Sequence, residues 1–205
     1  MIERAESFST RDGSELFVRP LTPADRAAYL RAFEHLSDET RYRRFLAPIK
    51  HLTSSEVAYF TNVDHRDHEA LIALTREGEI VGVARYIRFG EGADAAEVAV
   101  TVADAWQGRG VGTALLHRLA ERGRRAGVKA FRGICLTGNT DMQQLLRELG
   151  PGARASHPEP GLVEIEARLP SPGETHEPIT PALRAAAHGH HHAKSTGSPA
   201  SGPGP

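Results

Sequence analysis

The 205-residue sequence has a single cysteine, Cys135, and no long apolar run. With one cysteine no intrachain disulfide can form, which is typical of proteins from a reducing compartment. No stretch approaches the ~20 consecutive apolar residues that span a bilayer. The segment up to Pro20 also lacks the apolar core of a secretory signal. We therefore expect a soluble, cytoplasmic protein with no membrane partner.

The sequence also lacks an excess of charge of either sign. Its 25 Lys and Arg residues are balanced by 26 Asp and Glu residues, which leaves a net charge of −1. Nothing in this balance attracts the chain to a polyanion, so we expect no nucleic acid partner. A hydrophobic fraction of 40% and a charged fraction of 25% are ordinary for a globular protein.

Composition divides the chain into three parts. Seven of the 13 prolines fall within residues 170–205, where Ile179 and Leu183 are the large apolar residues. Such a segment cannot bury enough surface to offset its ordering entropy. We expect a disordered tail over 170–205, a single folded domain over 14–169, and a flexible N-terminus over 1–13.

A glycine-rich turn is the main motif of the sequence. It reads Gln107-Gly108-Arg109-Gly110-Val111-Gly112. The preceding residues 97–102 alternate as in a strand, and the apolar residues that follow recur at helical spacing. A strand that enters a helix through such a turn presents free backbone N–H groups at the positive end of the helix dipole. The pattern predicts a binding site for a phosphate or diphosphate.

The pattern of elements predicts the fold class. We expect a first strand at 16–19, then helices that begin near Pro23, Ser37 and Ser54. Strands follow at 69–75, 79–89 and 96–103, then a helix from the glycine turn to about 126, a strand at 128–136, a helix at 139–149 and a final strand at 162–169. One strand–helix–strand crossover within antiparallel neighbours gives a mixed α/β layer.

The motif does not fit two common phosphate loops. No Gly-Lys-Ser/Thr follows, as a P-loop requires, and Thr113 or Leu115 stands where a dinucleotide fingerprint needs its third glycine. It does fit Gln/Arg-x-x-Gly-x-Gly/Ala, and with its flanking strand and helix it resembles the coenzyme A loop of the GNAT acetyltransferase superfamily. The resemblance covers residues 14–169. It is greatest to the catalytic domain of bacterial protein lysine acetyltransferases, through the stretches 19–25, 41–45 and 96–100.

The resemblance implies a GNAT-like α/β fold with a mixed, mostly antiparallel sheet, flanking helices and a strand–helix–strand coenzyme A site. It also implies an N-acetyltransferase that takes its acyl group from acetyl-CoA and passes it to a primary amine, here a protein lysine. In the superfamily, the strand before the loop splays from its parallel neighbour and admits pantetheine. Carried over by position, the coenzyme-binding residues are Val100, Thr101, Val102, Gln107, Gly108, Arg109, Gly110, Val111, Gly112, Thr113 and Asn139.

Glu97 is the candidate general base. A carboxylate in a central strand is costly to place without a role, and a lysine with a reference pKa of ~10.4 must lose a proton before it attacks. The resemblance implies a glutamate here as well. The alternative is a strand glutamate that pairs with an arginine such as Arg85. Asn139 has two compatible roles, since it caps the following helix and in the superfamily contacts the pantetheine arm.

The other polar side chains give weaker indications of function. We expect no metal site, because His65 and His68 share a loop without a third ligand. Arg41, Arg43 and Arg44 either pair with Asp38 and Glu39, which we favour, or meet an acidic substrate. We expect Arg118, Arg122 and Arg125 to form a solvated helix face and Cys135 to fill the core.

One departure from the superfamily leaves the general acid unassigned. Many relatives carry a tyrosine seven residues after the asparagine, and here that position is Leu146. The departure keeps open a second function, a non-catalytic acyl-CoA-binding regulatory module. An acetyltransferase of a small-molecule amine also remains open. A nucleotide-binding oxidoreductase is weaker, because the chain lacks the βαβ context.

Overall fold

The structure is a computed structural model, and it describes residues 5–150 and 152–170. The predicted tail therefore lies outside the described residues, apart from Pro170. Within the described part, no helix is both long enough and apolar enough to cross a bilayer.

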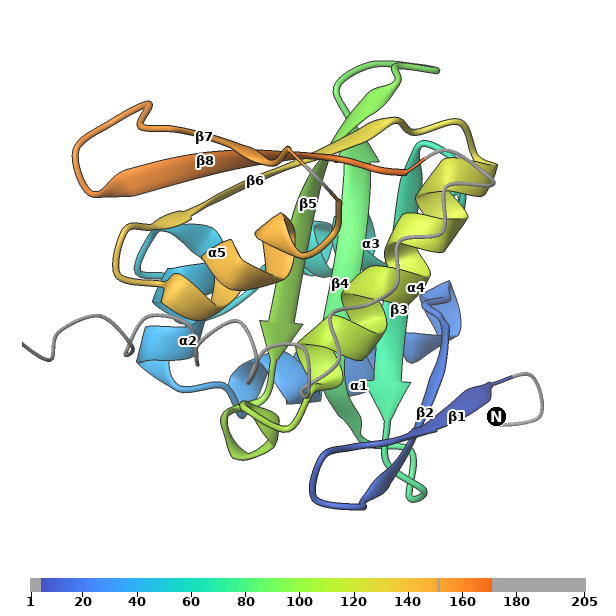
Figure 1. Ribbon diagram of the computed structural model, residues 1–205. Helices are drawn as coiled ribbons and strands as arrows, with labels where there is room; N and C mark the ends of the chain where they lie inside the picture. Colours follow the sequence, from blue (N-terminus) through green and yellow to red (C-terminus); the bar gives the residue numbers. More distant parts are fainter. Residues whose placement is uncertain (1–4, 151, 171–205) are drawn as a thin grey trace, which may run out of the picture. The chain divides into compact units, whose positions relative to one another are not determined.

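Eight strands form one sheet in the order β1-β2-β3-β4-β5-β6-β8-β7 (Figure 1). Every neighbouring pair is antiparallel except β5 and β6, which are parallel and joined by a helix. This confirms the predicted mixed, mostly antiparallel sheet. The strands are β1 (Glu6–Ser9), β2 (Glu15–Pro20), β3 (His68–Leu74), β4 (Ile80–Arg88), β5 (Ala95–Val102), β6 (Ala130–Leu136), β7 (Arg154–Ser156) and β8 (Leu162–Arg168).

Helices cover both faces of the sheet. Helices α4 and α5 lie on one face, and α1, α2 and α3 lie on the other (Figure 1). The helices are α1 (Arg26–Glu34), α2 (Asp38–Phe45), α3 (Ser54–Thr61), α4 (Val111–Arg125) and α5 (Thr140–Arg147), with short 3-10 turns η1 (Pro23–Asp25) and η2 (Asp104–Trp106). Each face has its own buried apolar cluster, so the sheet is packed from both sides.

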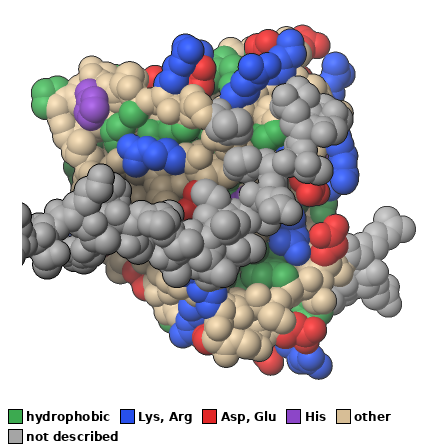
Figure 2. Space-filling view, viewed as in Figure 1, with side chains coloured by type: hydrophobic (Ala, Val, Ile, Leu, Met, Phe, Trp, Pro, Cys, Tyr) green, Lys and Arg blue, Asp and Glu red, His purple; other side chains and the backbone are tan. Residues whose placement is uncertain are grey.

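Helix α4 shows how the sequence specifies an element. Leu115 and Leu119 are fully buried, one turn apart, and pack against the sheet. Gly127 has a φ of +89° just after the helix, which matches its predicted place as a C-terminal cap. Arginines occupy the last turn of the helix, where they complement the negative end of its dipole. Figure 2 shows basic side chains gathered over this end.

The prediction of a flexible N-terminus over residues 1–13 was wrong where the structure describes this segment. Residues 6–9 form β1 and pair with β2 through a turn in which the Thr10 N–H donates to the Ser14 carbonyl. Phe8 packs against the main core beneath the Arg118 guanidinium. The three-residue strand β7 was also missed. Both strands are short and exposed, so their sequences carry little pattern, and the neighbouring strand supplies their order.

Candidate active site

Strands β5 and β6 separate soon after they meet. Their parallel pairing covers only Ala95 to Glu97, opposite Ala130 to Arg132. Strand β5 continues to Val102 while β6 diverges toward β8, as the ribbon shows (Figure 1). Glu97 is therefore the last residue of β5 in register with β6. Beyond it, the β6-facing edge of β5 is open.

The backbone groups on this open edge follow from the hydrogen bonds on the other edge. The Ala103 N–H donates to the Val81 carbonyl, at the end of the β4 ladder. Because hydrogen-bonded pairs alternate along an antiparallel ladder, the backbone groups of Val100 and Val102 face the gap. Thr101 does not fit its predicted role. Its backbone belongs to the ladder with β4, and its side chain lines a cavity on the other side.

The glycine-rich loop presents unbonded donors at the start of α4. Gly108 and Gly110 have φ values of +73° and +90°, a left-handed backbone that favours glycine. Among the described residues, no acceptor bonds the N–H groups of 108–113. The loop opens a helix of 15 residues with no side-chain cap. These are the features that bind an anion at a helix N-terminus.

Gly108 and Gly112 of the loop serve different purposes. A Cβ on Gly108 would meet nothing within 4 Å, so this position is open to a ligand. A Cβ on Gly112 would lie 3.3 Å from Leu145 Cδ1 and 3.7 Å from Val100 Cγ1. Gly112 therefore lets α4 pack closely against β5 and α5. Val111 is fully buried beside it, and Thr113 is partly exposed.

The turn between β1 and β2 supports the loop. The Arg11 N–H donates to the Arg109 carbonyl at 2.9 Å, and its guanidinium donates to the Gly108 carbonyl at 3.4 Å. The Arg109 guanidinium pairs with Asp12 at 2.8 Å and lies 5.0 Å from the Trp106 ring centre. The loop is thus held by a segment that the sequence pattern did not connect to it.

A second support comes from helix α2. The Asp104 carboxylate accepts hydrogen bonds from the Ser37 N–H at 2.9 Å, the Ser37 hydroxyl at 2.6 Å and the Thr40 hydroxyl at 2.7 Å. Partial burial raises the pKa of Asp104, but these hydrogen bonds outweigh it and hold the pKa below its usual value. Gln107 donates to Thr40 Oγ1 and to the Val102 carbonyl. The side chain of Gln107 therefore fixes the loop to β5 and α2.

Glu97 is exposed at the point where β5 and β6 part. It makes no hydrogen bond or ion pair with any described residue, so the predicted alternative of pairing with Arg85 is not what the structure contains. The β4–β5 register puts Glu97 opposite Ile87 and Arg85 opposite Ala99. Side chains alternate along a strand, so Glu97 points to the side that carries α1 and α2.

The remaining predicted residue, Asn139, follows β6 at the start of α5. Asn139 caps α5, since its Oδ1 accepts from the Met142 N–H at 3.2 Å. This confirms its capping role and leaves its amide nitrogen without a partner among the described residues. Leu146 is fully buried, and a Cβ on Gly133 would lie 2.5 Å from its Cδ1. No protic group therefore stands where many relatives have a tyrosine.

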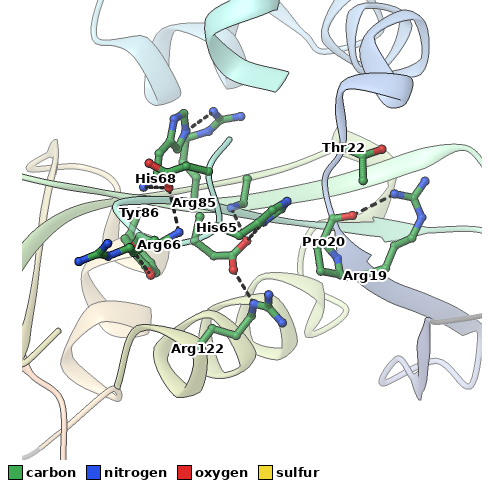
Figure 3. Close-up of polar contacts among 12 residues, drawn as sticks. Arg19, Pro20, Thr22, His65, Arg66, His68, Arg85, Tyr86 and Arg122 are labelled. Atoms are coloured by element: carbon green, nitrogen blue, oxygen red, sulfur yellow. Dashed lines mark hydrogen bonds and ion pairs between the residues drawn. The ribbon is translucent and has the colours of Figure 1, made fainter. Parts of the chain in front are cut away.

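The predicted solvated face of α4 is wrong at Arg122. Its Nε lies 2.6 Å from Oε2 of Glu69, a carboxylate that is 1% exposed. The other oxygen of Glu69 meets His65 Nδ1 at 2.7 Å (Figure 3). His68 faces Arg85 instead. The two histidines are thus engaged separately, and the described residues contain no group of three potential metal ligands.

Residues 29–150 match the model of the Acetyltransferase (GNAT) family. The chain is 35% identical over 141 residues to acetyltransferase Pat of Mycolicibacterium smegmatis, which covers 68% of this chain and 42% of that protein. It is 33% identical over 145 residues to acetyltransferase PA5475 of Pseudomonas aeruginosa, which covers 69% of this chain and 77% of that protein. The chain thus spans less than half the length of the first relative.

A solved structure agrees with these sequence matches. The GNAT domain of S. lividans PAT is similar with a TM-score of 0.73 and 36% identity. The similarity covers 80% of this chain and 97% of that domain.

Proposed function

The chain belongs to the acetyltransferase (GNAT) family, and on that premise we propose that it moves an acetyl group from acetyl-CoA to the side-chain amine of a protein lysine, with Glu97 as the general base. The observation that carries the proposal is the placement of three features on neighbouring elements. A cradle of unbonded N–H groups, an open strand edge and an unpaired carboxylate lie along one strand–loop–helix unit.

The residues present fit a coenzyme A thioester. The N–H groups of 108–113 suit its diphosphate, since they sit at the positive end of α4 and the space at Gly108 is open. The gap-facing backbone of Val100 and Val102 suits the two amides of pantetheine, although the Val102 carbonyl already accepts from Gln107. The free amide nitrogen of Asn139 supplies a donor from the start of α5, after β6.

Glu97 would accept the proton of the amine. At neutral pH only about one lysine in 10³ is uncharged, a penalty of ~4 kcal/mol. A positioned base, acting directly or through water, commonly returns 10²–10⁴ in rate. The Val98 N–H completes the parallel pairing of Glu97 with Arg132 of β6, so the first unpaired N–H beyond it on this edge is that of Val100. It would stabilise the developing oxyanion, a contribution of typically ~3–4 kcal/mol.

No general acid is assigned. The buried Leu146 cannot protonate the leaving sulfur, and a thiol pKa of ~8.5 lets a thiolate leave without one. The choice of a lysine acceptor is supported by the resemblance to bacterial protein lysine acetyltransferases and by the relatives named Pat.

The deciding experiment uses the full chain with acetyl-CoA and a panel of lysine peptides, read by free thiol release and by intact peptide mass. A mass gain of one acetyl group on lysine supports the proposal. Calorimetric binding of acetyl-CoA without thiol release would instead favour a non-catalytic acyl-CoA-binding module. Release with small amines alone would favour a small-molecule acetyltransferase.

A further inference from the structure

A cavity lies beneath β5, on the face of the sheet that carries α1 and α2. Its volume is about 40 Å³, enough for a carboxylate or a few waters. Ala99 and Thr101 of β5 form part of its wall, and Arg44 of α2 and Arg85 of β4 form another part. The same strand that borders the coenzyme gap therefore borders this cavity on its other side.

Arg85 is a buried cation without a counter-ion. Its side chain is 3% exposed, and its hydrogen bonds go to neutral groups, namely the Phe60 carbonyl, His68 Nε2 and the Tyr29 hydroxyl. Its guanidinium lies 4.7 Å from the centre of the Phe60 ring. No carboxylate among the described residues lies within ion-pair distance of it.

Arg44 adds a second charge to the same cavity. It lies over the Phe45 ring at 4.9 Å and makes no ion pair with a described residue, whereas Arg41 and Arg43 pair with Asp38 and Glu39 as predicted. Burial and the neighbouring Arg85 charge lower the pKa of Arg44 to about 10, and the charges of Tyr29 and Glu97 only partly oppose this.

Two other arginines of the chain, unlike Arg44 and Arg85, have a carboxylate partner. Arg19 pairs with the buried Asp25 at 2.6 Å, and Arg88 pairs with Asp67 at 2.9 Å. A buried charge without a partner is strongly unfavourable. Two facing cations in one cavity therefore indicate a site for an anion that the chain does not itself supply.

We propose that this cavity binds a carboxylate of the acceptor, supplied by an Asp or Glu beside the target lysine. The inference rests on the proposed function, because it names the acceptor class of that site. In the β4–β5 register, Arg85 and Glu97 are diagonal neighbours on one face, about 7–8 Å apart at their Cα atoms. A carboxylate held at Arg44 and Arg85 would bring a neighbouring amine to Glu97.

The test compares two lysine peptides that differ only in Glu or Gln beside the lysine, with the full chain and acetyl-CoA. We expect kcat/KM to be roughly tenfold higher for the Glu peptide, because a charge-assisted hydrogen bond contributes a free energy that corresponds to about this factor. The R44Q variant should bring this ratio close to one, and R44K should retain most of it. The matched control R43Q changes a neighbouring exposed arginine and should keep the ratio. Arg44 is preferred to Arg85 because truncation of a core side chain risks misfolding.

A second arm compares free amino acids with their α-amides, so that a free carboxylate is distinguished from an acidic peptide. A preference confined to the amino acids would overturn the peptide assignment. Equal rates for Glu and Gln peptides in the wild-type chain, or a ratio that R44Q leaves unchanged, would overturn the proposal.

A third arm does not depend on turnover. Thermal stabilisation by glutarate should exceed that by glutaramide, and R44Q should abolish the difference. If no lysine peptide is acetylated, the proposed function fails while this arm still tests the anion site. If glutarate and glutaramide stabilise equally, the anion site fails.

Discussion

The Thr40 hydroxyl donates a 2.7 Å hydrogen bond to Asp104 Oδ1, and this contact joins residues 64 positions apart. Thr40 lies in α2, and Asp104 lies in the 3-10 turn that leads into the glycine-rich loop. The loop that we assign to the diphosphate and the helix that supplies Arg44 are therefore fixed to each other. Glu97 lies on β5, the strand that leads into this turn and loop.

This relationship predicts the effect of Asp104→Ala. Three donors lose their acceptor, so we expect a loss of about 1–2 kcal/mol in the free energy of unfolding, reduced by solvent exposure of the site. The affinity for acetyl-CoA should also fall, because the loop loses its anchor. Denaturation and calorimetry measure the two effects. Asp38→Ala is the control, since its carboxylate pairs with Arg41 only at 3.6 Å and is mostly exposed. An equal loss in both variants would contradict the anchor.

Glu97→Gln should lower turnover by about 10²–10⁴ at neutral pH while acetyl-CoA binding stays intact. The deficit should shrink as the pH approaches the lysine pKa of ~10.4, because the amine then needs no base. A pH–rate profile and calorimetry test both points. Glu91→Gln changes an exposed carboxylate in the β4–β5 turn and serves as the control. Unchanged turnover at neutral pH would remove Glu97 from the mechanism.

Gly108→Asp should abolish acetyl-CoA binding, because it places a negative charge in the cradle. Aspartate tolerates a positive φ better than most residues, so the fold should survive. Gly78→Asp is a matched control, since Gly78 has a φ of +87° and open space around it but lies in the β3–β4 turn. Gly108→Asn separates charge from bulk and should keep part of the affinity. Retained binding by Gly108→Asp would show that the diphosphate lies elsewhere.

Glu69→Gln should destabilise the fold by about 1–3 kcal/mol, because Glu69 is a buried carboxylate bonded to both Arg122 and His65. Thermal or chemical unfolding measures the loss. Glu121→Gln removes an exposed carboxylate 3.7 Å from Arg125 and should change stability little. If the two variants were equally stable, the network in Figure 3 would contribute nothing measurable.

Stability should decline as the pH falls from about 6.5 to about 4. Burial, and next the Arg85 charge, lower the pKa of His68 from 6.5 to about 4. Between these values the unfolded chain binds a proton that the folded chain does not, so the free energy of unfolding rises with pH across this window. The effect is of order 1–3 kcal/mol at full size. Unfolding curves of His68→Gln across the window should be flatter. An unchanged slope would contradict the assignment.

Much of the fold could be predicted from the sequence because its signals are local. Period-2 alternation located β5, the capping box at Thr53 and Glu56 located the start of α3, and helical spacing located α4. The short edge strands β1 and β7 could not be predicted, since their order comes from the neighbouring strand and not from their own side chains.

The candidate site likewise combines features that local sequence patterns predict with features that only contacts between distant segments create. The loop glycines and the asparagine cap are local patterns, and the structure places them around one gap. Arg44, Arg85, Asp104 and the Arg122–Glu69 pair depend on contacts between distant segments, which no spacing in the sequence reveals. Thr101 was misassigned because the identity of a residue does not tell which neighbour its backbone bonds.

The sequence by itself determined the elements, their order and the motif that marks the family, because dihedral preferences, capping and side-chain periodicity act over a few residues. Only the tertiary structure decided which edge of β5 stays open, what supports the loop and which two arginines share a cavity. Those features depend on strand register and on packing across the sheet, where residues far apart in the chain first meet.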